Sequence, residues 1–197
     1  MSNPFIKGSS THFVSINITK FRTDTIGNSN SFKADGDLIY VLGKTYDELG
    51  ASEFYKLFNE LGAKVPKVRK EDAKRLYEKV MKANEQNLIE SCHDLSDGGL
   101  AIAVCESAIG TELGAELDVS EFGELSLNAI LFSESHSRFV TSIKSENKKK
   151  FVKLFGEDTT LIGEVTFDKR MIINFKEKCI VDIKMKKLEQ AWDEGLS

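Results

Sequence analysis

Cysteine, proline and tryptophan are scarce in this chain of 197 residues, which contains three Cys, two Pro and one Trp. Cys92, Cys105 and Cys179 form no CxxC pair, and an odd number does not suit a disulfide framework. We predict that they are small buried hydrophobic residues in a reducing compartment. A nucleophilic Cys92 is disfavoured, because sequence neighbours on a strand such as His93 point to opposite faces. The sequence therefore offers no catalytic residue that its pattern alone would identify.

Other features that would assign a function directly are also missing. No zinc-spaced set of Cys and His, no Walker loop and no Rossmann glycine motif is present, so we assign no metal ligand. No apolar run approaches the ~20 residues that cross a bilayer, and Met1–Ser10 lacks the apolar core of a signal peptide. These absences predict a cytoplasmic protein without a membrane partner.

The net charge of -4 disfavours nucleic acid as a partner, because phosphate backbones require clustered Lys and Arg. The one dense basic run, Lys148–Lys150, is typical of a solvated helix face. The length suffices for one sizeable domain with its own core, with or without an additional arm.

The chain divides into a polar N-terminal part and a compact remainder. Residues 1–32 are predicted to be an arm, with strand character at His12–Ile18 and a loop rich in Gly, Asn and Ser at Thr23–Ser31. Residues 33–197 are predicted to be a single domain.

Within that domain, helical and extended patterns are mixed. Leu38–Leu42 is wholly apolar, which predicts a strand buried on both faces, and Ser52 is expected to cap a helix over Ser52–Leu61 whose apolar stripe is buried. We expect further helices at 72–84, 98–109, 146–155 and 188–194, and further strands at 88–92, 137–144, 160–165, 171–175 and 179–185. The last two strands form a hairpin, so this order predicts an α+β fold with helices packed on a mixed or antiparallel sheet.

The first segment with chemical potential lies between a predicted strand and a predicted helix. Asp94, Ser96 and Asp97 are residue types that cap helices, and Gly98 and Gly99 allow a ligand or another backbone to approach closely. A helix N-terminus attracts anions, whereas carboxylates would instead hold Mg²⁺ or ribose hydroxyls. The alternative is purely structural: the side chains cap the helix and the glycines permit tight packing.

A second segment gathers an acid, hydroxyls, an imidazole and a guanidinium. Glu134, Ser135, His136 and Arg138 could bind a sugar phosphate, with Arg as a bidentate anion clamp and Glu on hydroxyls. The alternative is a polar turn in which Glu134 and Arg138 form an ordinary ion pair. A third segment, Leu49–Phe54, is typical of a helix start.

Taken together in this order, the segments resemble the phosphoribosylformylglycinamidine synthase family. The resemblance is carried by four stretches: Gly36–Gly43, Asp47–Phe54, Ser91–Ala101 and Leu131–Arg138. It implies the C-terminal domain of the fold shared with aminoimidazole ribonucleotide synthetase, in which an ATP-binding domain precedes an α+β domain. The arm would then be a remnant of the ATP-binding domain in the second of two tandem repeats.

The resemblance also implies a function. Such an enzyme makes formylglycinamidine ribonucleotide from formylglycinamide ribonucleotide in purine biosynthesis, using ATP, Mg²⁺ and ammonia from glutamine. The expected partners are the remaining domains of the synthase, a glutaminase domain or subunit and a small nucleotide substrate. We expect no cofactor bound tightly by this chain, and no activity from the chain alone.

The resemblance assigns no catalytic residue here. The family's substrate-contacting Glu-Ser-Gln belongs to its first repeat, and Glu134-Ser135-His136 is the counterpart with His in place of Gln. Ala51 stands where the family usually has Gly. A non-catalytic assembly domain, or another ATP-dependent member of the superfamily, remains the alternative; an exposed apolar face would favour assembly.

Overall fold

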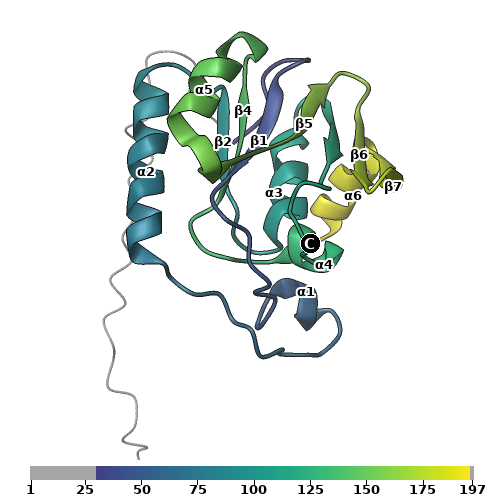
Figure 1. Ribbon diagram of the computed structural model, residues 1–197. Helices are drawn as coiled ribbons and strands as arrows, with labels where there is room; N and C mark the ends of the chain where they lie inside the picture. Colours follow the sequence, from purple (N-terminus) through teal and green to yellow (C-terminus); the bar gives the residue numbers. More distant parts are fainter. Residues whose placement is uncertain (1–29, 196–197) are drawn as a thin grey trace, which may run out of the picture.

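A seven-stranded sheet lies between two layers of helices in the computed structural model, which describes residues 30–195 (Figure 1). The predicted strand at His12–Ile18 falls outside the described residues. The strands are β1 Leu38–Leu42, β2 Ser91–Asp94, β3 Gly114–Asp118, β4 Phe139–Ile143, β5 Thr159–Thr166, β6 Arg170–Phe175 and β7 Lys178–Lys184. The helices are α1 Glu53–Lys56, α2 Lys70–Glu85, α3 Gly99–Ala108, α4 Leu127–Phe132, α5 Lys148–Phe155 and α6 Met185–Gly195.

The strand order is β2-β4-β1-β5-β3-β6-β7. β3 and β6 run parallel, and the other neighbouring pairs are antiparallel, so the predicted α+β class with a mixed sheet is confirmed. Within residues 30–195, no helix has both the length and the apolar composition that crossing a bilayer requires.

Strand β1 shows why the sheet is covered on both faces. Ile39 and Val41 belong to the apolar core on the side of α3 and α4. Tyr40 and Leu42 belong to a second core, on the side of α2 and α5. Successive side chains of a strand point to opposite faces, so a strand covered on both sides must be apolar throughout. The prediction for Leu38–Leu42 is therefore confirmed.

The predicted helix over Ser52–Leu61 is wrong in length and in burial. Ser52 does cap it, accepting a hydrogen bond from the Tyr55 N–H at 3.3 Å, but the helix ends after one turn. Leu57, Phe58 and Leu61 are 79%, 61% and 78% exposed. No described element covers Leu57, Phe58 and Leu61, and a helix whose apolar stripe is not packed does not extend stably in water.

Two elements were not predicted, β3 and α4. Both are short, and β3 begins at Gly114, whose place in the sequence looks like a loop. A Cβ atom on Gly114 would lie 2.2 Å from the Arg170 carbonyl oxygen, so glycine is required there for strand pairing. β2 is also displaced: it covers Ser91–Asp94, whereas residues 88–92 were expected.

The prediction that all three cysteines are buried is wrong for Cys179. This residue lies on β7, the outermost strand of the sheet, and is exposed. Cys92 and Cys105 are partly covered, and burial raises the pKa of the Cys92 thiol to about 12. A thiol with this pKa stays protonated at neutral pH, which agrees with the absence of a nucleophilic role.

Candidate functional site

Three segments that are far apart in the sequence meet at the Glu134 carboxylate. Its Oε1 atom accepts a hydrogen bond from the Gly98 N–H at 2.9 Å and another from the Glu53 N–H at 2.9 Å. Gly98 stands at the start of α3, and Glu53 is the first residue of α1. One carboxylate oxygen therefore joins the starts of two helices, where unpaired N–H groups and partial positive charge favour an anion.

This arrangement replaces the capping expected from the first segment. Asp94, Ser96 and Asp97 are exposed, and no side chain of the segment caps α3. The cap comes instead from Glu134, 36 residues further along the chain. The three exposed polar side chains are thus not used in holding the helix start.

The two glycines of the segment are explained by close packing. Gly99 has a φ of +65°, and a Cβ atom there would lie 2.6 Å from the Ser133 carbonyl oxygen. The start of α3 therefore rests against the backbone that follows α4. Only glycine allows this approach together with this backbone conformation.

Arg138 has a different position from that of an exposed anion clamp. It is 1% exposed, its Nε donates to the Ser135 carbonyl at 3.0 Å, and one terminal nitrogen donates to Thr45 Oγ1 at 3.0 Å. Its other terminal nitrogen donates to the Ser133 carbonyl. Burial lowers the pKa of Arg138 to about 10. The guanidinium thus organises the turn that carries Glu134, and it does not form the ion pair with Glu134 considered above.

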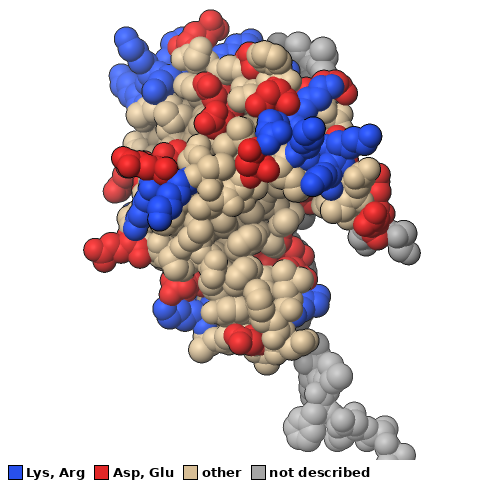
Figure 2. Space-filling view, turned by 90° about the vertical axis from the view of Figure 1, so that its right-hand side faces the viewer, with Lys and Arg blue, Asp and Glu red and all other residues tan. Residues whose placement is uncertain are grey.

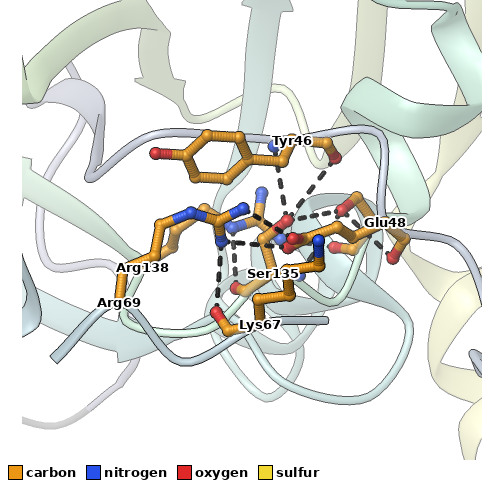
Figure 3. Close-up of polar contacts among 7 residues, drawn as sticks. Tyr46, Glu48, Lys67, Arg69, Ser135 and Arg138 are labelled. Carbon is orange, nitrogen blue, oxygen red and sulfur yellow. Dashed lines mark hydrogen bonds and ion pairs between the residues drawn. The ribbon is translucent and has the colours of Figure 1, made fainter. Parts of the chain in front are cut away.

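Ser135 is also buried and belongs to a polar network that the sequence did not reveal (Figure 3). The Glu48 carboxylate forms an ion pair with Arg69 at 2.7 Å, and the Arg69 guanidinium lies 3.4 Å from the centre of the Tyr46 ring. Burial of Glu48 opposes ionisation, but hydrogen bonds from Arg69 and Ser135 outweigh it and lower the pKa of this carboxyl. In the sequence, Glu48 and Arg69 are only an acidic and a basic residue 21 positions apart, and this separation does not imply that they are in contact.

His136 is exposed and is not hydrogen-bonded to Glu134. It lies at the mouth of a cleft beside α2. The other histidine near the site, His93, is held by Glu106, whose Oε2 lies 3.0 Å from His93 Nε2. Neither imidazole is placed as a general base against the Glu134 edge.

The described residues do not provide a metal site of their own. Within 30–195, no group of three or more His, Cys, Asp or Glu side chains is positioned to share an ion. Asp94 and Asp97 are both exposed and can offer carboxylate oxygens to a ligand hydroxyl or to a metal held mainly by other groups.

The fold and this edge define a class of protein. The chain belongs to the family described as AIR synthase related protein, C-terminal domain, whose profile matches residues 34–176. Two relatives are named phosphoribosylformylglycinamidine synthase subunit PurL. The protein from Thermococcus sibiricus is 37% identical over 82% of this chain and 23% of its own length. The protein from Carboxydothermus hydrogenoformans is 34% identical over 85% of this chain and 23% of its own length.

The chain therefore spans about a quarter of the length of these curated relatives. A solved structure, T. maritima PurL complexed with FGAR, superposes with a TM-score of 0.72 at 18% identity, covering 83% of this chain and 29% of that one. The T. maritima protein has also been solved with ATP and as PurLQS. At 18% identity the superposition establishes the fold alone, and this fold is the predicted one.

Proposed function

We propose that this chain is the C-terminal domain of a phosphoribosylformylglycinamidine synthase, an ATP-dependent carbon–nitrogen ligase of purine biosynthesis in the cytoplasm. The observation that supports it is the junction at Glu134, which brings together three of the four stretches that carry the resemblance. Identities of 37% and 34% to PurL subunits over more than four fifths of the chain support the same function.

In this proposal the domain supplies one wall of a nucleotide site. Asp94, Ser96 and Asp97 are exposed on the segment that Glu134 holds at Gly98, and their oxygens can bind ribose hydroxyls. Glu134 and Arg138 hold this wall in shape, and Ser135 lies buried between them and the Glu48 network. ATP, bound chiefly by the domains outside this chain, would supply the phosphoryl group that activates the formyl oxygen of the substrate.

An apolar surface beside this wall supports contact with further domains. Leu57, Phe58, Leu61, Val65 and Val68 are all exposed, and they follow one another in the chain around α1. Figure 2 shows few charged side chains on the lower end of the molecule, which α1 occupies in Figure 1. Contiguous exposed apolar side chains of this kind mark interaction surfaces.

Complementation in trans tests the proposal. The Carboxydothermus PurL subunit is shortened by the segment that this chain matches, 23% of its length, and the 197-residue chain is added back. Phosphate release from ATP is followed with formylglycinamide ribonucleotide and ammonium chloride, so that no glutaminase is needed. We expect activity only from the mixture. Failure to restore activity, or robust activity from the 197-residue chain alone, would contradict the proposal.

The same apolar surface favours a second candidate, a non-catalytic assembly domain. In that case the chain would bind the shortened subunit without restoring phosphate release. A Phe58→Ser/Leu61→Ser variant tests the surface that both candidates share, because it should weaken the association while leaving the hydrogen bonds of Glu134 unchanged.

A further inference from the structure

A cleft lies between α2, the end of α5 and the start of the β1–α1 connection. One wall is α2, which presents Asp72, Arg75, Leu76 and Lys79 at helical spacing. The other wall is the end of α5 and the turn that follows it, and Figure 1 shows α2 and α5 side by side on one face of the sheet. The cleft has a volume of about 370 Å³, within the range of small-molecule sites.

The positive charges of the cleft outnumber the negative ones. The basic residues are Lys44, Arg69, Arg75, Lys79 and Lys153, and the acidic residues are Asp72, Glu157 and Asp158. The chain as a whole has a net charge of -4, so the cleft opposes the sign of the protein around it.

One of these cations is fixed between the two walls. Lys79 Nζ donates to the Phe155 carbonyl at 2.8 Å and to Asp158 Oδ2 at 2.6 Å. This contact sets the distance between α2 and the end of α5, so the cleft is formed before any ligand enters it. A site whose walls are already in place loses less entropy on binding.

Two other cations are free to contact a ligand. Among residues 30–195, Lys44 and Lys153 have neither an ion pair nor a side-chain hydrogen bond, whereas Arg75 is paired with Asp72 at 2.5 Å. Among the described residues Glu157 has no ion pair either. One unpaired carboxylate against two unpaired lysines still leaves the cleft with a surplus of positive charge. Between the charged groups, Ala73, Leu76, Leu154 and Phe155 contribute an apolar lining.

The geometry points to a binding site for a phosphate ester, with Lys44 and Lys153 contacting the phosphate and the apolar lining receiving the sugar or base. Two unpaired ammonium groups, one from the β1–α1 connection and one from α5, suit a dianion that carries several acceptor oxygens. The inference goes beyond the proposed function, because neither Glu134 nor the exposed polar residues Asp94, Ser96 and Asp97 line this cleft.

Isothermal titration of the 197-residue chain tests the site at low ionic strength. The probes are ribose 5-phosphate, ADP and inorganic phosphate. We expect saturable binding that weakens about tenfold or more in Lys44→Ala/Lys153→Ala, which removes two charge-assisted contacts. Tighter binding of ADP than of ribose 5-phosphate would indicate that the cleft also binds the base. Equal binding of all three probes would indicate that it recognises the phosphate alone.

The matched control is Lys150→Ala/Lys178→Ala, which removes the same charge from exposed positions outside the cleft. It should bind like the unmodified chain. The inference is overturned if no probe binds, or if both lysine pairs weaken binding equally, because the ligand then lies elsewhere or is attracted only by net charge.

Discussion

Replacing Glu134 with alanine should separate the three segments that its carboxylate joins. The substitution removes two hydrogen bonds of 2.9 Å, to the N–H groups of Gly98 and Glu53. Gly98 is buried, so its N–H would lose its partner away from water, at a cost of about 1–3 kcal/mol. Glu53 is exposed, and water can replace the lost acceptor there. We expect a total loss of about 2–3 kcal/mol in the free energy of unfolding.

Urea unfolding of the 197-residue chain measures this loss, and hydrogen exchange locates it. Glu134→Gln keeps a carbonyl acceptor without the charge, so it should lose roughly half as much. The Gly98 amide should exchange faster in both variants, and most in alanine. Glu124→Ala, at an exposed acidic residue outside the site, is the matched control and should have the unfolding free energy of the unmodified chain. If Glu134→Ala matches that control and the Gly98 amide remains protected, the junction does not stabilise the site.

Three further predictions concern residues around the sheet. Burial, together with the nearby Glu90, raises the pKa of the Asp37 carboxyl above its usual 3.8, so the folded state holds this proton more tightly than the unfolded state. The free energy of unfolding should therefore fall as pH rises from 3.8 through the raised pKa. In urea unfolding, Asp37→Asn should flatten this dependence and increase stability at pH 7, whereas Asp35→Asn, at an exposed residue, should do neither. The Tyr40 hydroxyl is buried without a hydrogen-bond partner among the described residues, so Tyr40→Phe should raise the unfolding free energy by about 1 kcal/mol, and a decrease would imply a partner. Ala51 has a φ of +60°, so Ala51→Gly should raise the melting temperature by relieving about 1 kcal/mol of backbone strain, whereas a lower value would show that the strain is absent.

Elements with a strong local pattern were predictable from the sequence. The apolar run Leu38–Leu42 can bury side chains on both of its faces only as a strand covered on both sides. The helices predicted at 72–84 and 98–109 are present as α2 and α3, with ends within two residues of the prediction. Elements without a clear local pattern were not predictable in this way. β3 begins with a glycine and α4 has only six residues, and the stability of both comes from neighbours such as β5, β6 and α3.

For the candidate site, the sequence indicated the family but not how its residues are used. The four stretches Gly36–Gly43, Asp47–Phe54, Ser91–Ala101 and Leu131–Arg138, taken together, sufficed to indicate the family, which the comparisons confirm. The roles depend on contacts between residues 36 to 93 positions apart: Glu134 with Gly98 and Glu53, and Arg138 with Thr45. A hydrogen bond is decided by atomic distance and direction, and the separation of two residues in the chain fixes neither. Composition and local periodicity therefore determined the class of fold, and only the tertiary structure showed that the expected anion clamp is a buried support and that the helix start is capped from another segment.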